Sequence, residues 1–449
     1  MDFLETVRQA GIVGAGGAGF PTHVKLKASA EYFIVNAAEC EPLIETDKFI
    51  MREYADELVV AIEACAKAVG ASKKVIGLKA KYKAEIQSLT AAVKKAGSDI
   101  TIFEMPTFYP AGDEQILVRL VTGKSVPERG LPLNVGAVVD NVGTLLNVYD
   151  ALGGRPVTHK YLSVVGSVKA PVMLKVPVGT PVSECIAAAS PTIKDYALVI
   201  GGPMMGKYFG RDAEPALFVT KTTGNIIVLP ADHYLFRRAT MPLERIKAQA
   251  RAACIQCRFC TELCPRYLSG HSMRPNLVMR NIYREKLIDD DAEYLRAFGD
   301  AANCSECGVC EMFACPMGLS PRKVNIFIKG RLRERGIDVP KNASPQARED
   351  MIDRLVPTDR LIARLGLSEW NGLHAKECLE LAPERVSIAL KQHIGAPAVP
   401  CVSEGGEVKC GELIAAAAEN ALSANIHASM DGVIEHIDAN TAVIRAKGV

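Results

Sequence analysis

The sequence has no long hydrophobic run. No stretch of about 18 apolar residues is free of charged side chains, which argues against a membrane-spanning helix. It also lacks an excess of one charge, with 53 basic and 51 acidic residues, so nothing favours binding to nucleic acid. The first residues, MDFLETVRQAG, lack the basic start and apolar core of a secretory signal peptide. We therefore expect a cytoplasmic chain without a membrane span.

A disulfide framework is also missing, although the chain contains 14 cysteines. Eight of them stand in two short runs, and the other six are scattered, which is typical of a reducing compartment. We interpret the scattered thiols as small buried hydrophobic residues. They are Cys40, Cys65, Cys185, Cys378, Cys401 and Cys410.

Each cysteine run has the spacing C-x2-C-x2-C and ends in a further cysteine followed by Pro265 or Pro316. This is the ligand pattern of a two-cluster ferredoxin, in which the fourth cysteine of each run ligates the other cluster. That resemblance assigns one [4Fe-4S] centre to Cys254, Cys257, Cys260 and Cys315, and the other to Cys304, Cys307, Cys310 and Cys264. Structural zinc sites are the alternative, but zinc ligands come in pairs rather than in such triplets.

A glycine-rich loop follows the first few residues, from Gly14 to Gly19. Glycines at this density let backbone N–H groups approach an anion, which suits a phosphate. The strand that a dinucleotide-binding fingerprint requires is missing, because Ile12-Val13 is too short. From the residues alone, the segment is either a phosphate loop or a tight structural turn.

Strand-like and helix-like patterns alternate over residues 1–155. β-Rich runs at 32–35, 74–78 and 100–104 are separated by helical patterns at 48–69 and 83–95, and they predict a parallel α/β sheet covered on both faces. Residues 156–238 predict a small α+β module. Its strands are expected at 162–165, 172–176, 198–200 and 225–229, and its helix at 182–189.

The remaining chain predicts three further parts. Residues 239–345 carry the cysteine runs, and the long spacer with a helical pattern at 274–298 favours a helical ferredoxin over the compact two-hairpin kind. A polar, helical connector is expected over 346–388. Glycine turns between short β-rich runs over 389–449 predict a small β barrel-sandwich.

The segment GIVGAGGAGFPTHVKL resembles the flavin-binding loop of the flavoprotein subunit of respiratory complex I and, more closely, of the C subunit of the Rnf complex. Matching blocks follow in the family order at 35–42, 109–114 and 141–144. The resemblance implies a Rossmann-like domain that binds FMN and is reduced by NADH. One departure is that Asp113 and Glu114 stand where complex I subunits carry two adjacent glutamates.

The same resemblance implies the residues around the cofactor. The phosphate and ribityl side is assigned to Gly14, Gly16, Gly17, Gly19 and Lys25. The ribityl chain, the isoalloxazine and the approach of the nicotinamide are assigned to Asn36, Glu39, Glu41, Glu114, Asn141 and Thr144. Of these, Glu39 and Glu114 are the implied catalytic residues.

The order of the domains distinguishes between the related families. The segment 393–432 stands at the C-terminus here, whereas its counterpart opens the Rnf subunit, and this order resembles the cobalamin reductases of propanediol-utilisation microcompartments. Residues 199–206 resemble the β-grasp (SLBB) module of these proteins. The resemblance implies electron transfer from NADH through FMN and two [4Fe-4S] clusters to cobalamin, giving cob(I)alamin for coenzyme B12 regeneration.

The implied partners are cobalamin or a cobalamin-handling adenosyltransferase, and shell proteins, with the chain within or at the shell of a bacterial microcompartment. Two alternatives stay open: an Rnf-like subunit that donates to ferredoxin or quinone, and a non-catalytic electron conduit of a microcompartment. The chain lacks the D-x-H-x-x-G loop of base-off cobalamin proteins. It also lacks a lysine at a hairpin tip of the tail, so we expect no lipoyl or biotinyl carrier.

Overall fold

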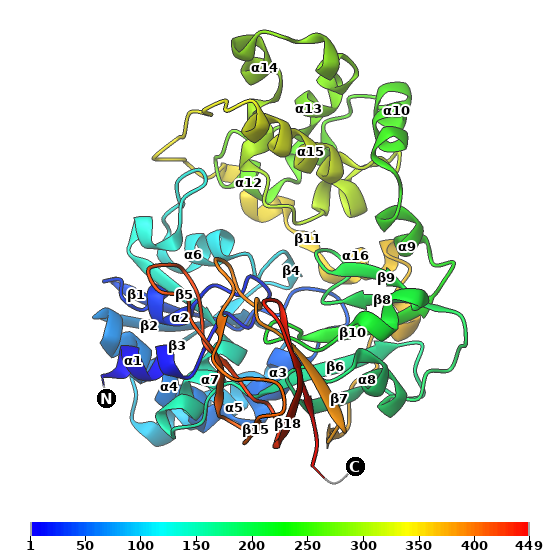
Figure 1. The fold of residues 1–449 in the computed structure, drawn as a ribbon. Coiled ribbons are helices and arrows are strands. Elements are labelled where there is room, and N and C mark those ends of the chain that lie inside the picture. The colour runs from blue at the N-terminus through cyan, green and yellow to red at the C-terminus, as the bar shows by residue number, and fades with distance from the viewer. Residues whose placement is uncertain (1, 448–449) are drawn as a thin grey trace.

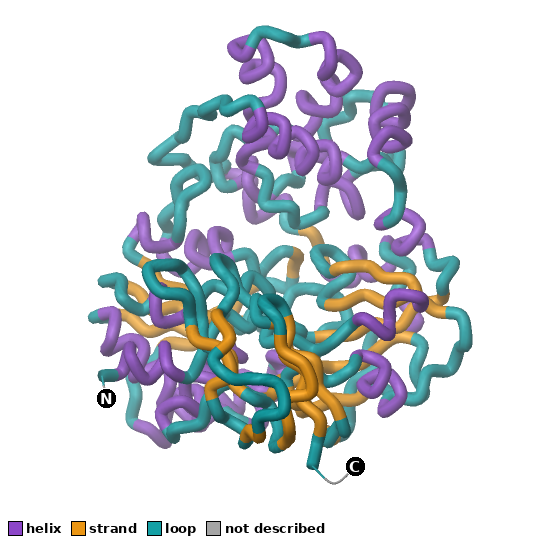
Figure 2. The backbone as a smooth tube through the Cα atoms, viewed as in Figure 1, coloured by secondary structure: helices purple, strands orange, loops and turns teal. Residues whose placement is uncertain are grey.

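The computed structural model describes residues 2–447. Figure 1 shows the region of the cysteine runs at the top of the molecule, above the N-terminal, middle and C-terminal parts. Figure 2 shows that this upper region is helical, whereas the strands lie below it. Multidomain architecture with mixed α/β and α+β parts is confirmed.

The N-terminal part contains a parallel sheet of order β3-β2-β1-β5. Phe33 and Val35 of β1 face a core with helices α4, α5 and α7, while Ile34 faces α6 on the other side. The predicted sheet covered on both faces is therefore confirmed. The strands are β1 (Tyr32–Asn36), β2 (Lys73–Lys79), β3 (Thr101–Met105) and β5 (Ala137–Asn141). The helices are α1 (Phe3–Gln9), α2 (Thr22–Lys25), α4 (Ala55–Val69), α5 (Lys83–Ala96), α6 (Glu114–Thr122) and α7 (Val142–Leu152).

The single helix predicted over 48–69 is wrong, because the chain forms α3 (Thr46–Glu53) and then α4. Tyr54 separates them with φ −125° and ψ 32°, outside the helical region. Its hydroxyl lies 2.6 Å from the Tyr161 hydroxyl of the middle part, so a tertiary contact holds the break.

The middle part is a mixed sheet of order β12-β7-β6-β10-β8-β9, packed on α8 (Val182–Ala188). The predicted strands are present, and β9 was missed. The strands are β6 (His159–Gly166), β7 (Val172–Pro177), β8 (Tyr196–Ile200), β9 (Lys207–Gly210) and β10 (Asn225–Pro230). The sixth strand, β12 (Cys378–Glu380), comes from the segment predicted as a helical connector and pairs in parallel with β7.

The cysteine-run region is helical, as predicted. Its helices are α10 (Leu243–Ala253), α11 (Phe259–Glu262), α12 (Pro265–Leu268), α13 (Pro275–Asn281), α14 (Asp291–Phe298) and α15 (Pro321–Glu334), and α9 (Tyr234–Ala239) precedes them at the end of the middle part. The one helix expected over 274–298 is wrong: α13 gives way to a 3₁₀ segment, Ile282–Leu287, before α14. Asp290 starts α14 by accepting a hydrogen bond from Glu293 N.

The connector is not purely helical. It contains α16 (Thr358–Arg364), but β11 (Val356–Pro357) pairs with β4 (Phe108–Tyr109) of the N-terminal part and β12 with the middle sheet. The tail forms the predicted sandwich of two small sheets. Its strands are β13 (Arg385–Ala389), β14 (Val399–Pro400), β15 (Glu407–Val408), β16 (Leu413–Ala416), β17 (Ile426–His427), β18 (Gly432–Ile437) and β19 (Thr441–Arg445).

Two further observations bear on the sequence expectations. Among residues 2–447, no helix is both long and apolar enough to cross a membrane. Cys65 and Cys185 are buried, as interpreted, but Cys378, Cys401 and Cys410 are exposed. The latter three lie in the short strands and turns of the connector and tail, which are too small to enclose every side chain.

Candidate flavin and cluster site

The glycine-rich loop closes on itself between two bridged residues, Val13 and Pro21. Gly14 N donates to Phe20 O at 2.9 Å, and Ala15 N donates to the Thr144 hydroxyl at 2.9 Å. Since Thr144 lies in the first turn of α7, this bond fixes the loop beside the N-terminus of that helix. Helix N-termini carry free N–H groups and partial positive charge, which suits a phosphate.

The glycines of the loop have different surroundings. A Cβ on Gly16 would lie 3.4 Å from Asn141, in ordinary contact, whereas one on Gly17 would meet no atom within 4 Å. Gly17 has φ +117°, a conformation that L side chains rarely adopt. A Cβ on Gly19 would instead lie 3.1 Å from Gln392 O of the tail. The loop therefore presents bare backbone to open space at Gly17, and this fits an anionic group of FMN.

Lys25, expected at the phosphate, lies in a partly buried ion pair. Its Nζ donates to Val139 O at 2.7 Å and to Asp140 Oδ1 at 3.1 Å, and Glu114 Oε1 lies 3.9 Å away. Burial alone would lower the pKa of Lys25, but Asp140 and Glu114 outweigh it and hold the pKa above its ordinary value. Lys25 is thus a charged group, and Asp140 is a partner that the sequence did not reveal.

Asn141 and Asp47 connect the loop to the acidic side of the site. Asn141 caps α7 by accepting from Gly143 N at 2.9 Å and donates to Asp47 Oδ2 at 2.7 Å. Asp47 N in turn donates to Glu39 Oε1 at 3.0 Å. A continuous series of hydrogen bonds, called the polar wall below, therefore joins the glycine loop and α7 to Glu39.

Glu39 is the most unusual carboxyl group of this wall. Its Oε2 is buried without a hydrogen-bond partner, although Lys48 Nζ lies 3.8 Å away. Burial raises the pKa of Glu39 to about 7, against the opposing charge of Lys48. Asn36, three residues earlier at the carboxyl end of β1, donates to Gly112 O at 2.8 Å. A buried carboxyl oxygen without a partner, at the edge where parallel sheets bind ligands, fits a polar cofactor edge.

Glu41 has a different environment from the one implied by the resemblance. Both carboxylate oxygens accept backbone bonds from the middle part, from Met204 N at 2.8 Å and Met205 N at 2.9 Å. Burial raises the pKa of Glu41 to about 7, although these N–H groups favour its charged form. The side chain joins the N-terminal part to the loop 201–206.

Glu114 and Asp113 are adjacent but differ in exposure and in their partners. The Glu114 side chain is half exposed at 50% and approaches Lys25. Asp113 caps α6, accepting from Gln115 N at 3.0 Å and Ile116 N at 3.2 Å. It also accepts from Arg266 Nη1 at 2.8 Å, and Arg266 follows the cysteine run by two residues. Asp113 therefore ties the flavin side to the cluster side.

The four cysteines of the first group line one cavity, which opens at the surface beside Ile255, Arg258 and Met317. Its sulfur-bearing residues are Cys254, Cys257, Cys260 and Cys315. Cys315 comes from the second run, so the structure brings together the set that the ferredoxin pattern assigned. A cavity lined by four thiols fits an iron–sulfur cluster.

The second group lies deeper, against the N-terminal part. Cys264, Cys307 and Cys310 are buried, and their thiols together with that of Cys304 are close enough to influence one another's ionisation. Burial raises the pKa of Cys307 to about 11. The Tyr109 hydroxyl donates to Cys307 O at 2.7 Å, across 198 residues of sequence.

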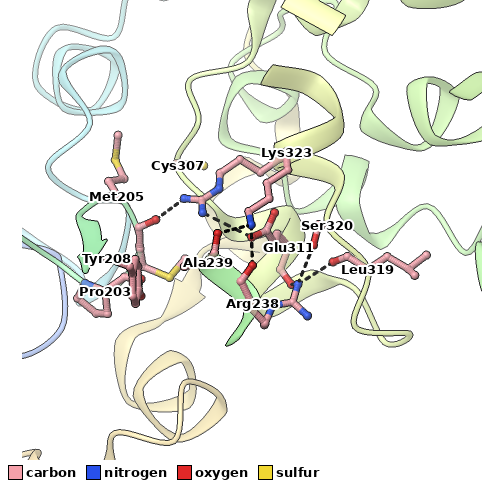
Figure 3. A network of polar contacts seen from close by, with 12 residues as sticks. Pro203, Met205, Tyr208, Arg238, Ala239, Cys307, Glu311, Leu319, Ser320 and Lys323 are labelled. Atoms are coloured by element: carbon pink, nitrogen blue, oxygen red, sulfur yellow. Dashed lines mark hydrogen bonds and ion pairs between the residues drawn. The ribbon is translucent and has the colours of Figure 1, made fainter. Parts of the chain in front are cut away.

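The loop 201–206 completes this junction (Figure 3). Arg322 donates to Met204 O and forms an ion pair with Glu311 at 3.5 Å, next to Cys310 in the chain. Glu311 is buried, with Arg238 donating to its backbone oxygen at 3.4 Å. Glu41, Met204 and Arg322 thus connect three parts of the chain beside the buried cysteine group.

Several of these residues were not predicted. Asp47, Asp140, Arg266 and Arg322 act through partners more than 90 residues away, so no local spacing reveals them. Tyr109 and Asp113 stand in a matched block, and that block was the available signal.

Three family models match the chain. They are the Nuo51 FMN-binding domain over residues 7–150, a 4Fe-4S dicluster domain over 253–320, and the RnfC barrel sandwich hybrid domain over 376–448. Cobalamin reductase PduS of Citrobacter freundii is 40% identical, covering 98% of this chain and 96% of that protein. The chain belongs to the cobalamin reductase PduS family.

Other relatives agree with this placement. Cobalamin reductase PduS of Salmonella typhimurium is 42% identical over 99% of this chain and 96% of that protein. The C subunit of the ion-translocating oxidoreductase complex of Rhodobacter capsulatus is 36% identical over 58% of this chain and 48% of that protein. The chain is therefore a flavo-iron–sulfur oxidoreductase with FMN and two [4Fe-4S] clusters as its cofactors.

Proposed function

We propose that this oxidoreductase passes electrons from NADH through FMN and the two clusters to a cobalamin, giving cob(I)alamin. FMN accepts a hydride as an electron pair and releases electrons singly, which suits iron–sulfur clusters as the next carriers. The observation that carries the proposal is the junction between the two sites. Tyr109, in the flavin-domain block, bonds directly to the backbone of Cys307 at 2.7 Å.

In this proposal different residues bind the phosphate, contact the polar edge of the flavin and border the nicotinamide site. Backbone at Gly14, Gly16 and Gly17 and the N-terminus of α7 bind the phosphate, while Lys25, paired with Asp140, supplies a positive charge. Glu39, with its unpartnered oxygen, faces the polar edge of the cofactor and can hold a proton near neutral pH. Glu114 borders the approach of the nicotinamide, where its exposure leaves it free to contact a ligand.

On the cluster side we propose the eight run cysteines as ligands. One set is Cys254, Cys257, Cys260 and Cys315, and the other is Cys304, Cys307, Cys310 and Cys264. Support comes from the shared cavity of the first set and the mutual proximity of the second. The fourth cysteine of each run belongs to the other set.

Cobalamin as the acceptor rests on the name shared by two relatives that match nearly the whole chain. We further propose that the chain works within or at the shell of a bacterial microcompartment, with shell proteins and a cobalamin-handling adenosyltransferase as partners. The cob(I)alamin produced would then serve coenzyme B12 regeneration.

An anaerobic titration tests the function. NADH should bleach the flavin absorbance of the purified protein and then the broad cluster absorbance. Subsequent aquacobalamin should restore both while cob(I)alamin forms. Clusters that are present but never respond to NADH would contradict the proposal and favour a conduit. Reoxidation by ferredoxin but not by cobalamin would instead favour an Rnf-like role.

A further inference from the structure

The two cysteine groups differ in their access to solvent. The group with Cys304, Cys307 and Cys310 lies against the N-terminal part, and Cys307 shares a core with Tyr109 and Met204. The group with Cys254 and Cys257 opens at the surface, and Cys257 itself is exposed. Electrons that enter from the flavin side therefore reach the surface at the group that contains Cys254 and Cys257.

The surface at this opening is unusually apolar. Ile255 is 61% exposed, Met317 46% and Phe259 49%. Ile255 and Met317 line the cavity that contains the four thiols, from opposite cysteine runs. Large exposed side chains that surround a redox centre are typical of a surface that another molecule covers.

The chain on one side of this opening carries an excess of basic residues. Between Glu244 and Glu262 the chain carries Arg245, Lys247, Arg251 and Arg258 and no acidic residue. Arg251 is exposed, and the Arg258 side chain is 57% exposed with only a distant ion pair to Glu262 at 4.0 Å. Across the cavity, the segment from Cys315 to Pro321 carries no acidic residue.

We infer that this opening is the docking surface for an acidic one-electron carrier protein. The outer rim, defined as Arg251, Ile255, Arg258, Phe259 and Met317, offers an apolar centre within a basic border. Such a surface is complementary to a carrier whose redox group is exposed within a ring of carboxylates, and opposite charges speed the encounter of the two proteins. The inference rests on the proposed electron path from NADH to the clusters and adds an acidic carrier protein as an acceptor beside cobalamin.

Docking can be measured without NADH, so that failure of the donor reaction does not obscure it. The protein is reduced with dithionite, freed of excess reductant and mixed with oxidised flavodoxin of net negative charge in a stopped-flow instrument. In each event one electron leaves the reduced protein and one is taken up by flavodoxin, with a proton from water. Binding of flavodoxin is measured separately by biolayer interferometry.

The decisive variant is the double change Arg251→Glu and Arg258→Glu. We expect the second-order rate and the affinity for flavodoxin to fall about tenfold or more at low ionic strength, and the loss to shrink in high salt. Transfer to cytochrome c, which is positively charged, should rise. Arg333→Glu is the matched control, because Arg333 is an exposed residue of the same domain, about 18 Å along α15 from Pro321 at the cavity.

Four outcomes would overturn the inference. Unchanged flavodoxin kinetics and binding in the double variant would show that the rim is not the docking surface. An equal loss in Arg333→Glu would show only a general charge effect. A difference in sedimentation between the double variant and the original protein, each without flavodoxin, would show that a second copy covers the rim. If Phe259→Ala and Met317→Ala slowed free aquacobalamin but not flavodoxin, the opening would serve a small acceptor instead.

Discussion

At the scale of single residues, Gly17 and Gly16 differ although they are adjacent. Of the two, Gly17 alone combines a positive φ, of +117°, with open space at the position of a Cβ. The loop is therefore shaped by two requirements, a backbone conformation that favours glycine and room for a ligand. The sequence showed the density of glycines but not which of them faces the ligand.

Gly17→Ala should weaken FMN binding about tenfold or more, because the methyl group adds strain and enters the proposed phosphate space. FMN retention is measured by absorbance after gel filtration, together with iron content, which should stay unchanged. Gly97→Ala is the matched control, since Gly97 also has a positive φ, of +62°, and open space, but ends α5. Equal FMN loss in both variants would contradict the assignment of the loop.

At the scale of elements, glycine turns predicted the sandwich, the long spacer predicted the helical cluster region, and the spacing of apolar residues predicted the parallel strands. It failed where a tertiary contact decides, as at Tyr54, whose bond to Tyr161 breaks a continuous helical pattern. It also failed for β11 and β12, because strands of two and three residues carry no periodicity. The grouping of Cys315 with the first run followed from the ferredoxin pattern, whereas the bond of Glu41 to Met204 followed from no pattern.

The crossing of the cysteine runs gives a prediction at this scale. Cys264→Ala should alter the paramagnetic signal that is lost in Cys304→Ala, and Cys315→Ala should alter the one that is lost in Cys254→Ala. The reason is that the thiols of each set lie near one another, as the proposed ligands of one centre. Cys65→Ala, a buried cysteine outside the runs, should leave both signals intact. If Cys264→Ala instead followed Cys254→Ala, each run would ligate its own cluster.

At the scale of the whole molecule, Lys221 joins three parts of the chain. Its buried Nζ donates to Gly11 O at 2.7 Å and to Asn425 O at 2.8 Å, linking the middle part to the N-terminal part and the tail. No carboxylate lies within ion-pair distance among the described residues. Burial lowers the pKa of Lys221 to about 7 from an ordinary value of 10.5.

This lysine predicts how stability depends on pH. Between pH 7 and 10.5 the unfolded chain binds more protons at Lys221 than the folded chain, so its contribution to stability should rise with pH. The slope is at most about 1.4 kcal/mol per pH unit, and below pH 7 the contribution should be constant. Thermal unfolding followed from pH 6 to about 10 should show this rise in the original protein. The rise should be reduced in Lys221→Met and unaffected in the exposed variant Lys409→Met.

The return of the chain through β11 and β12 has a consequence for biosynthesis. A ribosome releases the N-terminal and middle parts first, but the open edge of β7 receives its neighbour only when Cys378–Glu380 emerges. Until then the nascent protein carries an unpaired edge strand, and such edges recruit other chains. The cluster region is translated during this interval, so iron–sulfur assembly can begin while the middle sheet is still incomplete. Slow cluster delivery should therefore appear first as aggregation during synthesis, before any loss of flavin.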